Sequence, residues 1–381
     1  VLIKKDLKNM KINNHENLKK ITYNIRNVDI PSRFFFAPIN TGLSEKGILS
    51  KEYLEFYIER SHTSIGINYI GNVAIGSKYV TNPNTAYFTQ EVLQWKKLTR
   101  TIKENGSIPG IQIACRHSKY VPLRKMINNN KEEYIRRTKK DILDLSKQEI
   151  EEILQKFVEN AIKANDLGFD VIQIHAAHGY FLSQFLSTSL NIRKDEYNAN
   201  DILFIESIIK KIRHLRPNLI IDLRISFIEG IKDEKEEKIE KEKLIKKLVT
   251  LDIDIISFSN GIYDINKQLI YPIQKWGHAC FIENIVEYAN KYPEILWNYS
   301  GNIWDFNLIN FDDIPKNLSF SLGRSLIADP LFIEKSLNNK SHSINKCVYK
   351  NKCHYYSLNS THIGCPIYNQ NIFNKEGQIL S

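Results

Sequence analysis

Eight short apolar runs, separated by longer amphipathic segments, constrain the fold of this chain more than any other feature. Each run has about the length of a β-strand, and several are almost wholly apolar, as is typical of strands buried on both faces of a parallel sheet. Alternation of strands and helices implies such a sheet. Eight units in 381 residues predict an α/β fold, a (β/α)8 TIM barrel. The runs cover residues 34–38, 67–74, 108–114, 169–175, 219–226, 253–259, 295–300 and 318–322.

An open, doubly wound sheet is the alternative fold. It is disfavoured because no Gly-x-Gly-x-x-Gly turn follows any of the predicted strands. The clearest helix is expected to begin after Ser146, which forms a capping-box pattern with Glu149, and to end at Gly168. Two further helices are predicted over residues 239–251 and 281–292 from their apolar periodicity.

The barrel is predicted to be a single domain over residues 34–337. Residues 1–33 form an N-terminal extension that we expect to cap the bottom of the barrel, and residues 338–381 form a C-terminal tail. The sequence shows no internal repeat or linker that would separate a second domain.

The charge and the cysteine content limit which kinds of partner and which location the sequence favours. The net charge of +10, from 53 Lys and Arg against 43 Asp and Glu, raises the question of nucleic-acid binding. However, segment 233–238 mixes both signs, which is typical of a solvated helix face, so we expect no nucleic-acid partner. No apolar run is long enough to cross a membrane. Five irregularly spaced cysteines do not form a secreted disulfide framework, which favours a cytoplasmic location.

Polar residues and glycines stand where the predicted strands end. Active sites of such barrels lie at the C-terminal ends of the strands, so these residues are expected to surround one mouth. Their variety predicts a ligand with distributed polar groups and a phosphate. They are Asn40, Thr41, Gly42, Gly71, Asn72, Gln112, His175, His178, Arg224, Gly301, Gly323 and Arg324.

The most specific stretch of the sequence surrounds the fourth predicted strand. Residues 168–180 read Gly-Phe-Asp-Val-Ile-Gln-Ile-His-Ala-Ala-His-Gly-Tyr, and Gln184-Phe185-Leu186 and Asn191-Ile-Arg-Lys-Asp-Glu-Tyr197 follow. This stretch resembles the Old Yellow Enzyme family of flavin-dependent oxidoreductases. Further matching segments appear in the family's order: Arg33 with Ala37-Pro38, Gln112, Leu223 to Ser226, Leu322-Gly323-Arg324, and Ala328-Asp329-Pro330.

The resemblance implies FMN as cofactor, NADH or NADPH as reductant, and an activated C=C bond, such as that of an α,β-unsaturated carbonyl, as hydride acceptor. His175 and His178 would donate hydrogen bonds to the carbonyl oxygen, either as neutral imidazoles or with one imidazolium. Tyr180 would supply the proton. The alternatives are a structural His pair, a packed aromatic ring at Tyr180, and zinc ligation, although the Glu of the helical zinc motif and a third ligand are missing.

The resemblance also assigns residues to the cofactor. Arg224 would face the negative charge that develops near N1 of the flavin, with a structural salt bridge as the alternative. Gln112 would contact the pyrimidine edge. Gly301, Gly323 and Arg324 would bind the phosphate. The remaining predicted contacts come from the first two strand ends: Pro38, Ile39, Asn40, Thr41, Gly71 and Asn72.

Two loops differ from the usual family pattern. Residues 198–201 run almost directly into the next helix, so the loop after Tyr197 is shortened. The loop after the first strand is similar to that of the dienoyl-CoA reductase branch, in which Asn40 would take the flavin-tuning position, Thr41 would bond the O4/N5 edge and Gly42 would widen the pocket.

That branch often carries a four-cysteine cluster site after the barrel. Here Lys350 stands where one cysteine is expected, so Cys347, Cys353 and Cys365 cannot supply the four thiolates of a [4Fe–4S] cluster. The sequence favours a vestigial tail without bound metal, with a zinc site that adds His354 as the alternative.

Two rival functions remain open at this stage. A tRNA dihydrouridine synthase would account for the basic charge, and Gly364-Cys365-Pro366 is similar to its catalytic motif, but that triplet follows the last barrel helix. The other rival is a degenerate barrel that binds flavin or a partner without turnover. The expected partner is a small-molecule substrate, and the oligomeric state stays open, a homo-oligomer included.

Overall fold

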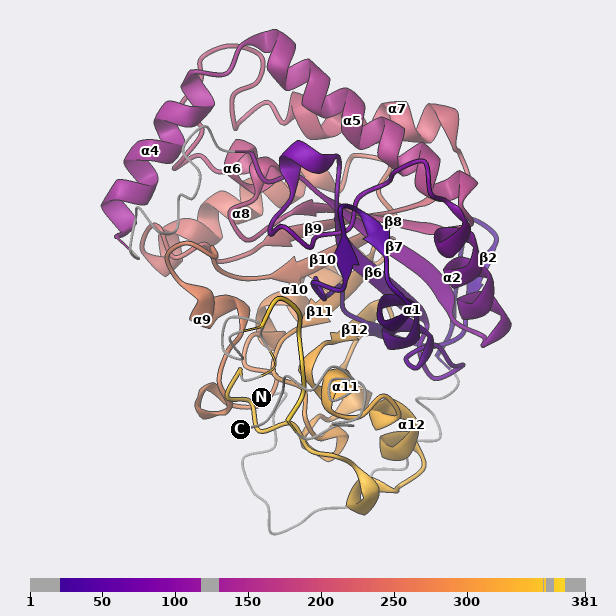
Figure 1. The fold of residues 1–381 in the computed structure, drawn as a ribbon. Helices are drawn as coiled ribbons and strands as arrows, with labels where there is room; N and C mark the ends of the chain where they lie inside the picture. Colours follow the sequence, from indigo (N-terminus) through magenta and orange to yellow (C-terminus); the bar gives the residue numbers. More distant parts are fainter. Residues whose placement is uncertain (1–20, 118–129, 352, 354–359, 367–381) are drawn as a thin grey trace.

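The computed structural model describes residues 21–117, 130–351, 353 and 360–366. Eight parallel strands close into a barrel, and each pairs with the next strand in the chain until the last pairs with the first (Figure 1). The prediction of a (β/α)8 barrel is therefore confirmed. The strands are β3 (Phe34–Phe36), β6 (Ile67–Ala74), β7 (Ile108–Ala114), β8 (Val171–Ala176), β9 (Ile220–Ser226), β10 (Ile255–Ser259), β11 (Leu296–Ser300) and β12 (Leu318–Leu322).

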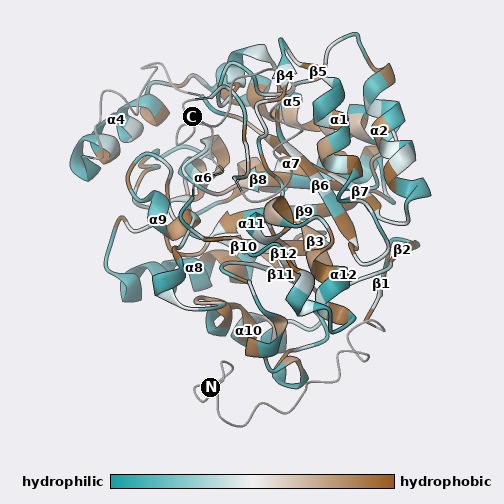
Figure 2. Cartoon of the chain, turned by 60° about the horizontal axis from the view of Figure 1, so that its bottom comes forward, coloured by the Kyte–Doolittle hydropathy of each residue, from teal (hydrophilic) through white to brown (hydrophobic). Residues whose placement is uncertain are grey.

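Helices surround the barrel, and their polar faces lie outward: apolar colour gathers among the central strands, while α4 and much of α8 are hydrophilic (Figure 2). The helices are α1 (Lys51–Ile58), α2 (Leu93–Glu104), α4 (Lys131–Leu143), α5 (Lys147–Asp166), α6 (Phe181–Leu186), α7 (Leu203–Leu215), α8 (Glu234–Leu248), α9 (Lys267–Ile270), α10 (Ile282–Lys291), α11 (Arg324–Ala328) and α12 (Phe332–Leu337). Among the described residues, no helix is long and apolar enough to cross a membrane.

Helix α5 follows its sequence signals closely. The Ser146 side chain accepts a hydrogen bond from the Glu149 backbone N–H at 3.2 Å, and the Glu149 carboxylate accepts one from the Ser146 N–H at 2.8 Å. Gly168 follows the helix with a φ of +97°, a conformation that favours glycine. Local capping chemistry thus fixes both ends of this helix.

Helix α8 differs from the prediction, which placed it over residues 239–251. It begins at Glu234, because the Asp233 side chain caps it by accepting from the Lys235 N–H, and it ends at Leu248. Ile239, expected to begin the buried stripe, is 56% exposed. The first turn is wholly charged, so apolar periodicity could not detect it.

The N-terminal end of the barrel is closed by a hairpin of β1 (Tyr23–Ile25) and β2 (Val28–Ile30). Its apolar side chains pack against a buried cluster that includes Phe35 and Tyr69, on strands β3 and β6. An ion pair of 2.8 Å between Arg26 and Asp254 ties the hairpin to the start of β10. A second hairpin, β4 (Ser44–Glu45) and β5 (Ile48–Leu49), follows β3.

The described part of the C-terminal tail returns to the opposite, C-terminal end of the strands. The Tyr349 hydroxyl donates to the Ile303 carbonyl at 2.7 Å, and the Ile363 N–H donates to the Thr41 carbonyl at 2.8 Å. The tail therefore contacts the loops after β11 and β3, where the yellow trace crosses this end of the barrel (Figure 1).

Candidate active site

A cavity of about 350 Å³ lies at the C-terminal ends of the barrel strands. The structure brings all but three of the predicted site residues, Thr41, Gly42 and Gly71, to its wall, from β3, β6, β7, β8, β9, β11 and β12 or the loops after them. A Cβ on Gly42 would stand 2.3 Å from the Thr361 carbonyl oxygen, so the tail, not a wider pocket, accounts for that glycine. The residues at the wall are Pro38, Ile39, Asn40, Asn72, Gln112, His175, His178, Tyr180, Arg224, Gly301, Gly323 and Arg324.

Thr41 and Gly71 are the two predicted cofactor contacts that do not line the cavity. The Thr41 hydroxyl accepts from the Leu43 N–H at 3.3 Å, and its carbonyl is bonded to the tail. The Gly71 N–H donates to the Tyr57 hydroxyl at 3.0 Å. Polar groups of both residues therefore form hydrogen bonds within the protein, and a flavin contact from the Thr41 hydroxyl is not supported.

Asn40 and Asn72 line the cavity beside a cluster of threonines. The Asn40 amide donates to the hydroxyls of Thr81 at 2.7 Å and Thr85 at 2.9 Å. The Thr81 hydroxyl also contacts the Asn72 oxygen at 3.4 Å. The side chain predicted to tune the flavin is thus held in one orientation by the loop after β6.

The two histidines and Tyr180 gather at the end of β8. The ring centroids of His175 and His178 are 4.9 Å apart, and those of His175 and Tyr180 are 4.7 Å apart. His178 has a φ of +63°, and its backbone N–H donates to the Ser226 hydroxyl at 2.9 Å. Its Nε2 lies 2.6 Å from the Ser259 hydroxyl. Strands β9 and β10 therefore fix the turn that presents all three rings to the cavity.

Burial, with the nearby Arg224 guanidinium adding to it, holds the pKa of His175 well below its usual value of 6.5. The pKa of His178 is lowered in the same way by burial, then by His175 and Arg224. Both imidazoles are therefore neutral at neutral pH, and each offers one N–H. Of the two forms considered above, the structure supports neutral hydrogen-bond donors rather than an imidazolium.

A belt of polar side chains crosses the barrel interior below the cavity. The Gln112 amide donates to the Gln173 oxygen at 2.6 Å, and Gln173 donates to Asp222 at 2.5 Å. The same Asp222 oxygen accepts from the Tyr69 hydroxyl at 2.6 Å and the Ser257 hydroxyl at 2.8 Å. Burial raises the pKa of Asp222 to about 6, against these hydrogen bonds. The belt holds Gln112 at the floor of the site.

Sequence analysis missed the belt, although a signal was present. Polar residues stand two apart on several predicted strands, and positions two apart point to the same face of a strand. In a barrel of this kind both members of such a pair therefore face the interior at different heights. The pairs are Gln173 and His175, Asp222 and Arg224, Ser257 and Ser259, Asn298 and Ser300, and Ser319 and Ser321.

Unsatisfied buried atoms test whether these residues suit a flavin. Arg224 Nε, His175 Nδ1 and the Ser300 hydroxyl are buried and have no hydrogen-bond partner among the described residues. Buried polar groups normally have partners. Burial lowers the pKa of Arg224, although the Asp222 carboxylate acts in the opposite direction. A ligand with hydrogen-bond acceptors along one edge would satisfy Arg224 Nε, so the floor of the cavity suits the pyrimidine edge of an isoalloxazine.

The residues assigned to the phosphate lie together at the other side of the cavity, and their geometry distinguishes the two glycines. A Cβ on Gly301 would stand 2.7 Å from the Tyr299 hydroxyl, so that glycine is required by a protein neighbour. A Cβ on Gly323 would meet nothing closer than 3.9 Å, so its backbone borders open space that a ligand group can approach.

Arg324 is already oriented by protein oxygens. It donates to the Asn302 oxygen at 2.7 Å, the Pro272 carbonyl at 2.8 Å and the Asn351 oxygen at 2.9 Å. Its guanidinium also lies 4.6 Å from the centre of the Tyr349 ring. The tail therefore helps to position the cation predicted to bind the phosphate, a role that the sequence did not indicate.

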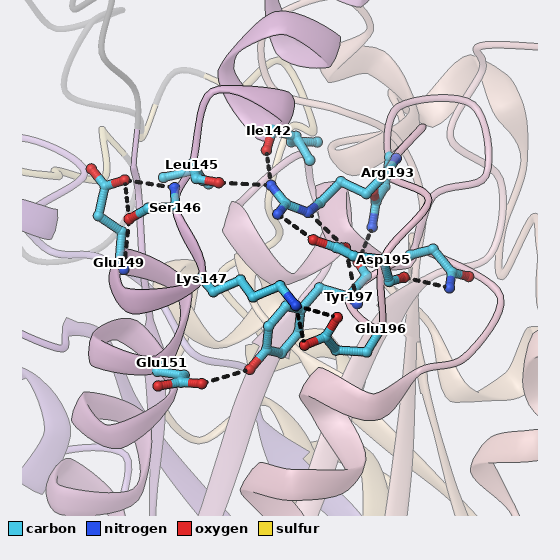
Figure 3. A network of polar contacts seen from close by, with 12 residues as sticks. Ile142, Leu145, Ser146, Lys147, Glu149, Glu151, Arg193, Asp195, Glu196 and Tyr197 are labelled. Carbon is cyan, nitrogen blue, oxygen red and sulfur yellow. Dashed lines mark hydrogen bonds and ion pairs between the residues drawn. The ribbon is translucent and has the colours of Figure 1, made fainter.

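The Asn-x-Arg-x-Asp-Glu-Tyr motif does not line the cavity. Arg193 donates to the carbonyls of Ile142 and Leu145, each at 2.8 Å, and pairs with Asp195 at 2.5 Å (Figure 3). Glu196 pairs with Lys147 at 2.7 Å. The motif thus joins the loop after α6 to the turn between α4 and α5, a structural role.

The tail cysteines lie near one another. Burial raises the pKa of Cys353 to about 12, and the thiols of Cys347 and Cys365 act in the same direction. Cys353 lines the cavity, but Cys365, on which the dihydrouridine synthase alternative rests, does not. The described residues contain no group of three or more His, Cys, Asp or Glu side chains arranged for a metal ion, and His354 lies outside them.

Comparison with known proteins places this cavity in context. Residues 23–341 match the model of a family described as the NADH:flavin oxidoreductase / NADH oxidase family. The chain is 26% identical over 348 residues to an NADPH dehydrogenase of Clostridium acetobutylicum, covering 84% of this chain and 95% of that protein. It is 26% identical over 344 residues to an NADH oxidase of Thermoanaerobacter brockii, covering 85% of this chain and 51% of that protein.

Solved structures share the fold. The chain superimposes on an Old Yellow Enzyme from Pichia sp. AKU4542 with a TM-score of 0.67 and 16% identity, covering 93% of this chain and 96% of that one. A 2-naphthoyl-CoA reductase gives a TM-score of 0.75 and 18% identity, covering 92% of this chain and 56% of that one. The chain thus spans about half the length of the NADH oxidase and of the 2-naphthoyl-CoA reductase, and nearly all of the Clostridium acetobutylicum NADPH dehydrogenase and of the Old Yellow Enzyme.

Proposed function

Since this chain belongs to the NADH:flavin oxidoreductase / NADH oxidase family, we propose that it is an FMN-dependent ene-reductase that uses NADH or NADPH. Its substrate would be an alkene activated by a conjugated carbonyl. The observation that carries the proposal is the set of three rings, from two neutral histidines and a tyrosine, at the wall of one cavity. In that cavity Arg224 Nε, His175 Nδ1 and the Ser300 hydroxyl are buried without a hydrogen-bond partner among the described residues.

When bound, FMN would accept hydride from the nicotinamide and deliver it to the β carbon of the alkene. The protein would make that carbon electrophilic. His175 and His178, each neutral with one N–H, would donate hydrogen bonds to the carbonyl oxygen, where negative charge develops as the β carbon accepts hydride. The Ser259 hydroxyl, which accepts from Arg224, can donate to His178 Nε2 and so hold that ring while its single N–H stays available for the carbonyl, which favours this role.

Tyr180 would donate its phenolic proton to the α carbon. A phenol with an ordinary pKa near 10 is protonated at neutral pH and can act as a general acid. The Tyr180 ring lies beside His175 and lines the same cavity, so a carbonyl bound by the His pair would lie within its reach. The turn 177–180 holds the ring through a hydrogen bond of 3.2 Å from the Tyr180 N–H to the Ala177 carbonyl.

Arg224 and Arg324 would hold the cofactor at its two charged ends. Arg224 lies on β9 beside His175 on β8, so its unsatisfied Nε suits the ring that must lie next to the His pair. Arg324, oriented by Asn302 and Asn351, would grip the phosphate next to Gly323.

The decisive experiment separates the two half-reactions of Tyr180→Phe. Removal of the hydroxyl should leave flavin reduction by NAD(P)H and binding of p-hydroxybenzaldehyde largely intact, but should slow reduction of cyclohexenone by roughly 10²-fold or more. Tyr263→Phe is the matched control, because that ring lies 5.8 Å from Tyr180 and lines the same cavity. It should slow neither half-reaction by more than a few-fold.

Cyclohexenone turnover at the wild-type rate by Tyr180→Phe would show that the proton comes from elsewhere. A wild-type protein that binds FMN and oxidises NAD(P)H, yet reduces no alkene, would refute the ene-reductase proposal. A protein that binds flavin without either half-reaction would support the degenerate barrel.

A further inference from the structure

The charged residues around the cavity are all of one sign. Among the described residues that line it, four are cationic and none is Asp or Glu. Two of the cations, Arg224 and Arg324, are accounted for by the flavin ring and its phosphate. Arg116 and Lys267 are not used by the proposed function, although they line the same space as His178 and Tyr180. A cavity wall lined by cations of this kind suits a ligand that carries a further negative group.

Backbone hydrogen bonds hold Arg116 beside the turn 177–180, which carries His178 and Tyr180. Its N–H donates to the Tyr79 carbonyl at 3.1 Å, and the carbonyl of the preceding Cys115 accepts from the Phe181 N–H at 3.0 Å. The chain at Arg116 is thus fixed directly alongside Tyr180 and Phe181. Burial acts to lower the pKa of Arg116, but the Asp264 carboxylate and, after it, the Tyr180 phenol raise that pKa, which agrees with this proximity.

Asp264, in the loop after β10, lies beside the same turn 177–180 and next to Arg116. The Tyr263 N–H donates to the His178 carbonyl at 3.1 Å, so the loop after β10 runs beside the turn that carries the His pair. The Asp264 carboxylate, 6% exposed, lies 3.3 Å from Arg116 Nη2. This long contact is the only hydrogen bond or ion pair of the Arg116 guanidinium among the described residues.

A guanidinium carries five N–H donors, and this one uses a single donor weakly. The Arg116 side chain is 22% exposed at the cavity wall, so its other donors are open to a ligand there. Arginine binds carboxylates through two parallel N–H donors, which a single carboxylate oxygen at 3.3 Å does not satisfy. Asp264 therefore orients the guanidinium and leaves its paired donors for another anion.

We infer that Arg116 is a specificity-determining residue that binds a carboxylate carried by the substrate. This inference rests on the proposed function, because it places the activated C=C between the His pair and Arg116. The substrate class is then an electron-poor alkene that bears a carboxylate as well as a conjugated carbonyl. Lys267, at the same wall, would add long-range attraction for that charge.

The test compares 4-oxopent-2-enoate with its methyl ester, which keeps the enone and removes the negative charge. Affinity is measured from the change in flavin absorbance on titration, and kcat/KM from NAD(P)H oxidation. Each variant uses the ester as its own reference, so the reported quantity is the acid-to-ester ratio. Arg116→Gln should lower this ratio roughly 10- to 100-fold in both measurements, the size expected for loss of a partly buried charge-assisted contact.

Asp264→Asn provides a prediction of opposite sign. It removes the carboxylate that competes for Arg116, so the acid-to-ester ratio should rise. Arg116→Lys keeps the charge without the paired donors and should retain part of the wild-type ratio. FMN content and circular dichroism identify any variant that has not folded.

Equal losses for acid and ester in Arg116→Gln, or a wild-type protein that binds both equally, would overturn the inference. Weaker NAD(P)H binding by Arg116→Gln with an unchanged acid-to-ester ratio would also overturn it and assign Arg116 to the nicotinamide cofactor's phosphates. Failure of the proposed function looks different: the acid would bind in an Arg116-dependent manner but would not be reduced.

Discussion

Asp222→Asn tests the polar belt beneath the site. Asp222 is fully buried, and one of its oxygens accepts from Tyr69, Gln173 and Ser257. Its other oxygen, Oδ1, has no hydrogen-bond partner among the described residues. Asparagine has nearly the same shape and stays neutral at every pH, so the substitution isolates the cost of the buried charge.

The direction in which stability changes with pH follows from the pKa of Asp222. Burial raises the pKa of Asp222 from 3.8 to about 6, so the folded protein holds this proton more tightly than the unfolded chain does. The resulting stabilisation is fully present below about pH 4 and is lost as the pH rises through about 6. This rise in the pKa of Asp222 corresponds to roughly 3 kcal/mol, most of which is lost between about pH 4 and pH 7.5.

The measurement is urea unfolding followed by circular dichroism at both pH values, with the same excess of FMN in every sample. The free energy of unfolding of Asp222→Asn minus that of the wild type should become more positive by roughly 2 to 3 kcal/mol from pH 4 to pH 7.5. Asp29→Asn, at an exposed position of the β1–β2 hairpin, is the control and should show no comparable change. A difference for Asp222→Asn that stays constant within about 0.5 kcal/mol would refute the reasoning.

Three further outcomes are expected. Arg324→Gln should weaken FMN retention by ~10-fold or more in dialysis against a flavin-free buffer, whereas a Lys→Gln change on the charged helix α8 should not. Ser146→Ala should lower the free energy of unfolding by about 1 kcal/mol, measured in urea, because the capping box of α5 loses its hydroxyl acceptor. Anaerobically purified protein should contain almost no iron or acid-labile sulfide, and stoichiometric iron would contradict the missing fourth thiolate inferred from Cys347, Cys353 and Cys365.

Sequence patterns predicted the barrel and all eight of its strands, because strands buried on both faces are rich in apolar residues and several of them are almost wholly apolar. They predicted α5 because its caps are local. They failed where a long-range contact decides the outcome. Thr41 turns toward the tail because its carbonyl bonds Ile363, far along the chain, and nothing near Thr41 in the sequence indicates this. The contribution of Asn351 to the position of Arg324 has the same origin.

Strand β9 connects the polar belt to the floor of the cavity. Asp222 and Arg224 are two residues apart and face the interior at different heights, Asp222 in the belt and Arg224 at the cavity floor. Burial lowers the pKa of Arg224, while the Asp222 carboxylate opposes that effect, and Arg224 in turn opposes the rise in the pKa of Asp222. A negative group bound at Arg224 would take over this compensation and weaken the support that Arg224 gives to the Asp222 charge. The proton on Asp222 and the anion at the cavity floor are therefore coupled through one side chain, Arg224, so that binding at the floor and protonation in the belt favour each other.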